Sequence, residues 1–156
     1  MGRRAQIRMS DDEVQAFLDE ERTVICATNG PRGWPHLMPL WYVVRSDDAG
    51  APQVWAWTFA KSQKAVNLGR DPRASLQVEA GESYDELRGV MLECDVVVHD
   101  ALADVRAFGL ELYARYAEVD DDVRAMVDAQ APKRIAMQFV ERKRATWDHR
   151  KLGGIY

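Results

Sequence analysis

The sequence lacks several features that would place it in a specialised class. It has only 2 cysteines in 156 residues, and Cys26 and Cys94 each lie in an apolar run. We therefore expect two small buried hydrophobic residues, not disulfides or metal ligands. No run of about 18 apolar residues is present, so no transmembrane helix is expected. The basic residues near Met1 have no apolar stretch behind them, unlike a secretory signal. These absences predict a cytoplasmic protein with no membrane partner.

An excess of positive charge is also missing. The chain carries 21 Lys and Arg against 25 Asp and Glu, a formal net charge of -4. This balance argues against nucleic acid as the main partner. Basic residues nevertheless gather locally between Lys61 and Arg73. The hydrophobic share of 47% in 156 residues predicts one globular domain with a sizeable core.

Catalytic motifs are absent as well. His36, His99 and His149 are far apart and have no ligand spacing such as HExxH, so we expect no metal site. There is no GxSxG elbow, no Walker loop and no GxGxxG. A chain without a nucleophile or an acid–base pair suits an enzyme whose cofactor carries the chemistry. It suits a ligand carrier equally well.

The most informative segment is residues 55–78, WAWTFAKSQKAVNLGRDPRASLQV. Alternating bulky residues predict a strand over 55–58, and Ser62 is suited to cap a short helix over 64–68. That helix should end at Asp71, because the residue before a proline is driven out of the α region. A further strand is expected over 74–78. The segment therefore predicts a strand, a helix and a strand in close succession.

The start of this helix is a candidate anion site. A helix N-terminus offers unpaired N–H groups and a partial positive charge. We expect Lys61 and Lys64, three positions apart, to share one helix face beside the Ser62 hydroxyl. This combination suits a phosphate. The alternative is a capped surface helix with solvated lysines, and these residues alone leave both interpretations open.

The remaining elements predict the fold class. Strands are expected over residues 23–28, 36–45, 87–99 and 133–147, with helices capped by Ser10 and Asp100 and another starting in the acidic run 118–122. Pro39 indicates an edge or a bulge, and Gly89 a kink. About six strands with a few helices predict an α+β, mainly β domain. We expect a small antiparallel barrel with helices packed outside it.

Tryptophan is abundant, with 5 residues in the chain. Trp55 and Trp57 share one strand face, and Trp41 lies on the preceding strand. One hypothesis is that the three rings line a slot for a flat ring system. The alternative is that they fill the core.

Residues 55–78 and the upstream run GPRGWPHLMPLWYVV resemble the pyridoxamine-phosphate-oxidase-like split-barrel flavoproteins, most closely their flavin or deazaflavin oxidoreductase branch. The recurring pattern is a Gly-x-Pro hairpin, a strand and a Lys-x-x-Asn-Leu-x-x-Asp-Pro-Arg segment. Here Gly33-Trp34-Pro35 and the segment from Lys64 to Arg73 match it. The similarity covers roughly residues 10–147. It implies a six-stranded antiparallel split barrel with peripheral helices.

The resemblance also implies a homodimer, with two cofactor sites in grooves between the subunits. The cofactor phosphate would meet Lys64, and the ring system would lie along the second strand. The implied cofactor contacts are Pro39, Trp41, Thr58, Lys61, Ser62, Gln63, Lys64 and, from its position, Trp147 of the partner subunit.

The function implied by the resemblance is that of an oxidoreductase. A bound deazaflavin coenzyme F-420 or FMN would transfer a hydride to or from a small organic substrate. Relatives often carry an arginine two residues before the lysine, where this chain has Ser62, so the choice of cofactor stays open. The tail lacks the Arg-x-His pair of true pyridoxamine phosphate oxidases, so vitamin B6 oxidation is not expected. The alternatives are an unliganded structural dimer and a carrier or sensor of flavin, haem or tetrapyrrole, with His36 as a haem ligand.

Overall fold

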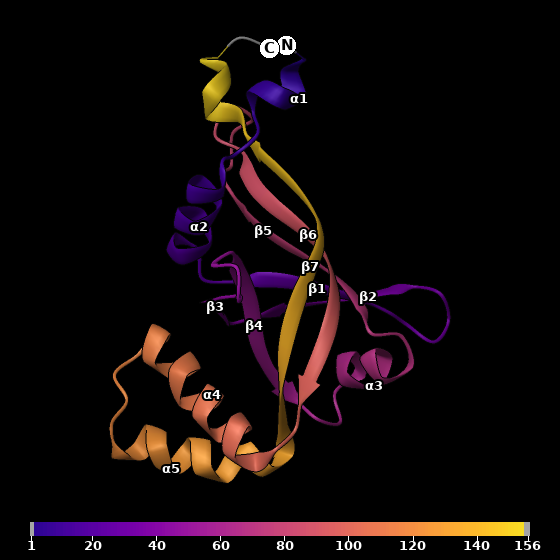
Figure 1. Ribbon diagram of the computed structural model, residues 1–156, viewed down its shortest axis with the longest axis vertical. Helices are drawn as coiled ribbons and strands as arrows, with labels where there is room; N and C mark the ends of the chain where they lie inside the picture. The colour runs from indigo at the N-terminus through magenta and orange to yellow at the C-terminus, as the bar shows by residue number, and fades with distance from the viewer. Residues whose placement is uncertain (1, 155–156) are drawn as a thin grey trace.

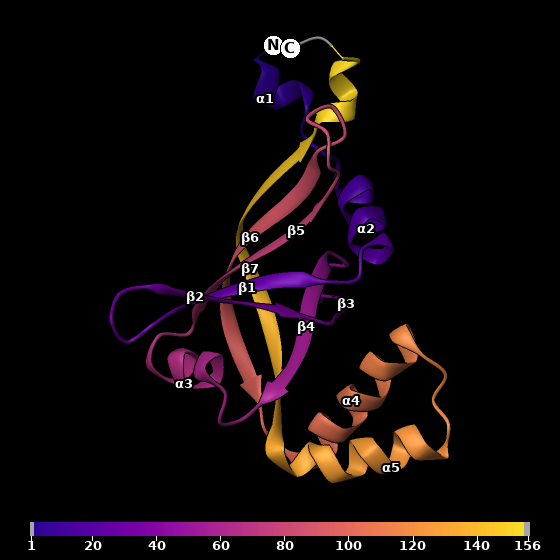
Figure 2. The same ribbon diagram turned by 180° about the vertical axis from the view of Figure 1, so that it is seen from behind.

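The computed structural model describes residues 2–154, which form seven strands in one curled antiparallel sheet, with five α-helices around it (Figure 1, Figure 2). The strands are β1 (Val24–Asn29), β2 (Pro35–Leu40), β3 (Tyr42–Ser46), β4 (Pro52–Phe59), β5 (Arg73–Ala80), β6 (Arg88–His99) and β7 (Arg134–Asp148). The helices are α1 (Arg3–Gln6), α2 (Asp11–Glu20), α3 (Gln63–Arg70), α4 (Leu102–Tyr116) and α5 (Asp121–Gln130), with 3-10 turns η1 (Ala131–Lys133) and η2 (His149–Leu152). The strand order across the sheet is β2-β1-β5-β6-β7-β4-β3.

The prediction of six strands was wrong, because residues 36–45 form two strands and not one. β2 ends at Leu40 and β3 begins at Tyr42, with Trp41 between them. β2 pairs with β1 at one edge of the sheet, whereas β3 pairs with β4 at the other edge. Since a single residue connects the two edge strands, the sheet curls until its edges approach each other. Pro39 lies in the edge strand β2, as predicted.

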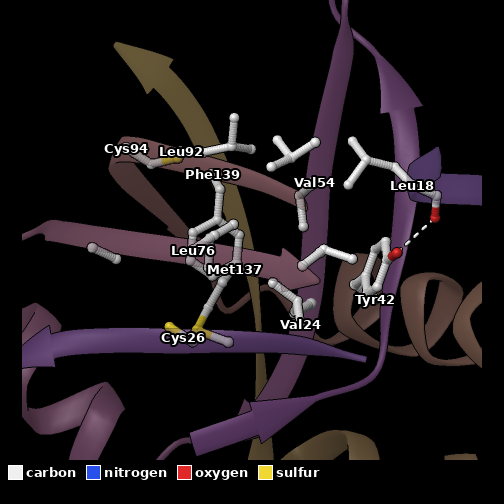
Figure 3. Packing of buried hydrophobic residues seen from close by; sticks show 14 of the residues in the cluster. Leu18, Val24, Cys26, Tyr42, Val54, Leu76, Leu92, Cys94, Met137 and Phe139 are labelled. Carbon is white, nitrogen blue, oxygen red and sulfur yellow. Dashed lines mark hydrogen bonds between the residues drawn. The ribbon is translucent and has the colours of Figure 1, made fainter. Parts of the chain in front are cut away.

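The main core fills the concave side of the curled sheet, where α2 also contributes side chains. Val14, Phe17 and Leu18 of α2 are buried there. Figure 3 shows part of this cluster, with residues Leu18, Val24, Cys26, Tyr42, Val54, Leu76, Leu92, Cys94, Met137 and Phe139 labelled.

Both cysteines are buried and free, as predicted. Burial raises the pKa of Cys26 to about 11 and that of Cys94 to about 12. Two buried thiols with raised pKa values are poor nucleophiles.

Local side-chain bonds determine where several helices begin. Ser10 and Glu13 form the predicted capping box at the start of α2. Asp120 in the acidic run accepts a hydrogen bond from the backbone N–H of Val123 at 2.9 Å and caps α5. The predicted cap at Asp100 was wrong, because Ala101 occupies the N-cap of α4 and makes no side-chain capping bond. None of the helices in the described part of the chain is long and apolar enough to cross a bilayer.

A second, smaller core lies between the sheet and the pair of helices α4 and α5. Trp57 is its centre and is only 5% exposed. Gly109 of α4 lets the helix approach closely, since a Cβ at this position would lie 3.0 Å from the Trp57 ring. Trp55 stacks on His99 in the same layer, with 4.9 Å between ring centroids. The core interpretation is therefore confirmed for Trp57, and the three tryptophans do not line an open slot.

Candidate functional site

The turn from β4 into α3 brings three polar side chains together. Ser62 is the N-cap of α3, as predicted, because its hydroxyl accepts a hydrogen bond from the N–H of Ala65 at 3.3 Å. The same hydroxyl lies 3.3 Å from the hydroxyl of Thr58 at the end of β4. Lys64, in the first turn of α3, donates from Nζ to Thr58 Oγ1 at 3.0 Å. Thr58, Ser62 and Lys64 therefore form one connected group.

The ammonium of Lys64 is buried without a counter-charge. The residue is 6% exposed, and no carboxylate within residues 2–154 forms an ion pair with it. Burial lowers the pKa of Lys64, and the positive charge of Arg134 lowers this pKa further. Removing a charge from water is costly unless an opposite charge compensates it. An anion that reached this position would therefore be bound favourably.

Lys61 does not share the environment of Lys64. The helix begins at Gln63, so Lys61 precedes the N-cap and lies in the turn after β4. Its side chain is exposed, whereas that of Lys64 is buried. The prediction that the two lysines lie on one helix face was therefore wrong. Of the two lysines, only Lys64 belongs to the connected group of Thr58, Ser62 and Lys64, which we call the buried polar group.

Asn67 attaches α3 to the sheet. It is fully buried, and its Nδ2 donates to Thr28 Oγ1 of β1 at 3.0 Å. Its Oδ1 accepts hydrogen bonds from Gln63 Nε2 at 2.8 Å and from Arg70 Nη2 at 3.3 Å. Arg70 also donates to the carbonyl oxygen of Asn29 at 2.6 Å. Gln63, a predicted cofactor contact, thus has a structural bond in the same network.

The Asp71-Pro72-Arg73 sequence determines how the chain leaves α3. Asp71 accepts hydrogen bonds from Asn29 Nδ2 at 2.8 Å and from Arg73 Nε at 2.9 Å. These bonds, that from Arg73 first, hold the pKa of the Asp71 carboxyl well below its usual range. The carbonyl oxygen of Pro72 accepts from the N–H of Val96 in β6 at 2.8 Å. Both ends of α3 are therefore tied to neighbouring strands, which orients Lys64.

The register of β1 and β2 shows which side chains of β2 face the buried polar group. Cys26 lies close enough to Lys64 to affect its pKa, and it pairs with Met38. Thr28 pairs with His36. Directly opposite residues of an antiparallel pair share a face, so Met38 and His36 lie on the side of Cys26 and Thr28. His36 was expected here only as a haem ligand, and Met38 was not among the expected cofactor contacts, because only the register shows which side chains of β2 face this group.

Pro39 and Trp41, two predicted cofactor contacts, lie elsewhere on this edge. Pro39 pairs with Ile25, so it faces the opposite side of the sheet from Met38. The ring of Trp41 stacks on Tyr116 of α4, with centroids 4.2 Å apart and planes 4° from parallel. The structure therefore does not bring these two residues into the group around Lys64 within one protomer.

Trp147 lies at the far end of β7 from the buried polar group. It pairs with Gly89, while Thr58 pairs with Ile135 near the start of β7. These two positions are about 12 residues apart, which corresponds to about 40 Å of extended strand. Within one protomer Trp147 is thus remote from Lys64. Its expected role as a contact from a second subunit stays a prediction.

Arg134, the first residue of β7, lies beside the end of β4 but on the other face of the sheet from Thr58, where its guanidinium contacts the rings of Trp57 and Phe59. It pairs with Phe59, the neighbour of Thr58, and burial lowers the pKa of its guanidinium. The pairing of β4 with β7 determines this position, which the sequence did not reveal.

Comparisons with known proteins identify the family. The sequence model of the family described as pyridoxamine 5'-phosphate oxidase matches residues 10–151. The chain belongs to this family. The family prediction made from the Lys64–Arg73 segment is confirmed. Among curated protein sequences, none matches the chain.

Solved structures of similar proteins agree with the fold of this family. A conserved hypothetical protein from Mycobacterium tuberculosis is 40% identical, with a TM-score of 0.86 over 100% of this chain and 95% of that chain. An F-420 reductase is 17% identical, with a TM-score of 0.67 over 84% of this chain and 94% of that chain. A haem storage protein from Vibrio cholerae is 12% identical, with a TM-score of 0.62 over 88% and 93% of the two chains. The last two likenesses concern the fold alone.

Proposed function

We propose that this protein is an oxidoreductase that binds a deazaflavin coenzyme F-420 or FMN beside the turn between β4 and α3. The observation that carries this proposal is the buried ammonium of Lys64, which no carboxylate in the described residues neutralises. It lies in the first turn of a helix, where backbone N–H groups also favour an anion. Membership of the pyridoxamine 5'-phosphate oxidase family supports a flavin-type ligand for this site.

We assign different parts in such a site to Lys64, Thr58 and Asn67. Lys64 and the first N–H groups of α3 would bind the phosphate of the cofactor. Thr58 orients the ammonium through its hydroxyl, and Asn67 holds α3 in place against β1. The bound ring would supply hydride transfer to or from a small organic substrate. The protein would position the two reactants and exclude water, so no side chain needs to act as a base.

We also propose that the cofactor sites are shared by two copies of the chain. The edge strand β2 exposes apolar side chains, with Leu37 58% and Met38 43% exposed. Trp34, in the hairpin before β2, is 73% exposed. An uncovered edge strand with apolar side chains tends to pair or to be covered. A second copy on this edge would also allow Trp147 of the partner subunit to reach the ligand.

The experiment is a titration of the purified protein with FMN and with coenzyme F-420, followed by tryptophan quenching and the visible spectrum. Lys64→Met should weaken binding by about ten- to a hundredfold, because a charge-assisted hydrogen bond is lost. Lys143→Met is the matched control, since Lys143 is an exposed lysine of β7 that faces Glu93 at 3.8 Å. An unchanged dissociation constant for Lys64→Met, with an intact circular dichroism spectrum, would refute the site.

A haem carrier is the second candidate, because a haem storage protein shares this fold. His36 has a buried Nδ1 that finds no hydrogen-bond partner among the described residues. Haem added to the protein should then give a shifted Soret band that disappears in His36→Ala. Tight haem binding with weak binding of both redox cofactors would favour the carrier over the oxidoreductase.

A further inference from the structure

The second half of β7 has a neighbouring strand on one side only. β6 pairs with β7 from residue 136 to residue 148, whereas β4 pairs with it only from Arg134 to Phe139. Beyond Phe139, no strand within residues 2–154 pairs with the side of β7 that β4 occupies. Figure 1 shows α2 and the β3–β4 pair on this same side of β7, one above the other. The second half of β7 is therefore an open strand edge, which presents unpaired backbone groups.

A hydrogen bond of Asp148 shows which backbone groups face the open side. Its N–H donates to the carbonyl oxygen of Ile7 at 2.8 Å and so points away from β6. Backbone direction alternates along a strand, and the register with β6 is regular over residues 143–148. The N–H and C=O groups of Thr146 and Arg144 therefore also point away from β6. Neither residue forms a backbone hydrogen bond on this side with another residue of the described chain.

The chain itself already covers both ends of this side of β7. At one end, Ile7 accepts the hydrogen bond of Asp148, and the N–H of Met9 donates to Thr146 Oγ1 at 2.9 Å. An extended segment thus lies along the last residues of β7, and β4 lies along the first ones. Residues 140–145 remain between the two. This open stretch corresponds to about 20 Å of extended strand.

A groove of about 630 Å³ follows the open stretch, between the start of α2, the β3–β4 turn and β7. Its lining carries one guanidinium, that of Arg144, and four carboxylates, those of Asp11, Asp12, Asp47 and Glu141. Arg144 donates to Glu141 at 2.8 and 2.9 Å and to Asp11 at 3.0 Å, so its charge is already paired. Asp12 is exposed and forms no ion pair within residues 2–154. The groove therefore has an excess of negative charge.

We propose that this groove binds an extended, lysine- or arginine-rich segment of another protein, which adds as a strand to the open edge of β7. The backbone of the segment pairs with Arg144 and Thr146, and its cationic side chains lie against the carboxylates of the groove. Main-chain hydrogen bonds give such a complex its affinity, and complementary charge gives it selectivity. The inference is independent of the proposed function, because Thr58 and the attached Lys64 lie beside Ile135, near the start of β7.

The probe is a fluorescein-labelled peptide of about eight residues in which lysine and threonine alternate, so that the charges share one face of a strand. Its binding to the protein is followed by fluorescence anisotropy. The same peptide with glutamate in place of lysine should bind at least about tenfold more weakly, because its charges are repelled by the groove. The lysine–threonine peptide N-methylated at every second amide should also bind about tenfold more weakly, since it keeps the charge and loses main-chain donors.

Asp12→Lys should weaken binding of the lysine–threonine peptide by about three- to tenfold at low ionic strength, because it reverses one exposed charge of the groove. Asp122→Lys is the matched control, since Asp122 is likewise exposed and likewise the second residue of its helix. Both variants lose the same kind of interaction with a helix dipole, so only the first should change peptide binding. Equal binding by the two variants would overturn the groove as the binding site.

Amide hydrogen exchange followed by mass spectrometry tests the strand addition itself. The lysine–threonine peptide should slow exchange in residues 140–146 and leave exchange in α5 unchanged. Binding without this protection, or equal binding of the N-methylated peptide, would show a purely electrostatic contact and overturn the proposal. Protection that rises with the concentration of the protein alone would mean that a second copy occupies the edge, which overturns it as well. FMN binding should be the same in Asp12→Lys and the wild type, so failure of this inference leaves the proposed cofactor site in place.

Discussion

The indole ring of Trp147 covers the backbone of Gly89, its partner across the β6–β7 pair. A Cβ built at Gly89 would lie 2.2 Å from Cζ2 of that ring. The ring of Trp147 can therefore occupy this position only because residue 89 has no side chain. Gly89 is thus required for a close approach, and the irregularity in the pairing of β6 with β7 lies between Glu93 and Cys94.

Gly89→Ala should destabilise the fold by about 1–3 kcal/mol, because the ring and the methyl group cannot occupy the same space. The emission of Trp147 should change as well, which urea unfolding followed by fluorescence would detect. Gly69→Ala is the control, since nothing lies within 4 Å of a Cβ at that position in α3. That change should be neutral or stabilise by about 0.5–1 kcal/mol, as alanine favours a helix. A Gly89→Ala protein as stable as the wild type would contradict the packing.

Removing the buried charge of Lys64 should stabilise the protein in the absence of ligand. Burial lowers the pKa of Lys64, which means that the folded state disfavours the charged form. Lys64→Met should be neutral or more stable by about 1 kcal/mol, a rise of about 2–4 °C in the thermal midpoint. The same variant should lose the stabilisation that added cofactor gives the wild type. A clear loss of stability without ligand would show that Lys64 is needed for the fold.

Asn67→Ala should be among the most costly changes at a polar position. It leaves the hydroxyl of Thr28 and the amide of Gln63 without their partner and detaches α3 from β1. We expect a loss of about 2–3 kcal/mol in urea unfolding at neutral pH. Gln15→Ala removes an exposed side-chain bond to Asp19 within α2 and should cost less than about 0.5 kcal/mol. Equal losses in the two variants would argue against a structural role for Asn67.

The stability of the protein should depend on pH through Asp148. This carboxylate is 5% exposed and accepts hydrogen bonds from Arg150 at 2.7 and 2.8 Å, which hold its pKa below the usual value. Because the pKa of Asp148 is lower in the folded state than in the unfolded state, its negative charge stabilises the fold at pH values above the unfolded-state pKa, which is near 4. This contribution is lost as the pH falls through the folded-state pKa. Asp148→Asn should therefore cost about 1 kcal/mol at about pH 7 and progressively less below about pH 4. A difference that stays constant with pH would exclude this ion pair as the cause.

If two copies associate through β2 as proposed, Leu37→Glu should leave the protein monomeric, because it places a charge on the exposed face of this strand. Light scattering at micromolar concentration would measure the change, and cofactor binding should weaken with it. Leu102→Glu is the matched control, since Leu102 is 57% exposed at the start of α4 and Leu37 is 58% exposed. A wild-type protein that is already monomeric would remove the shared groove from the proposal.

Local signals in the sequence were sufficient for several of the helix caps, although not for the one at Asp100, and for much of the strand pattern. Ser10 and Ser62 were predicted as caps because capping depends on residues within one turn. The break at Trp41 was not predictable in this way, since the apolar run is continuous and only the pairing of β2 and β3 with different strands divides it. The burial of Lys64 and the exposure of Lys61 likewise depend on the position at which α3 begins.

The candidate site was predictable to the extent that it lies within one segment. Thr58, Ser62 and Lys64 are close in the chain, and the structure brings them together. Met38 reaches the same region through the pairing of β1 with β2, which composition and spacing do not specify. Trp147 is a contact only if a second subunit supplies it.

The single-residue corner at Trp41 also has a consequence for the kinetics of folding. The hairpins β1–β2 and β3–β4 on either side of it are local in sequence, so each can form early at a small cost in loop entropy. β4 must then find β7, which follows it in the chain only after α3, two further strands and the helices α4 and α5. We therefore expect the β4–β7 pairing to limit the folding rate, as non-local strand pairings do. If a hairpin forms before the β4–β7 pairing, mutations in that hairpin should mainly change the rate of folding. If the hairpin forms after this pairing, its mutations should mainly change the rate of unfolding.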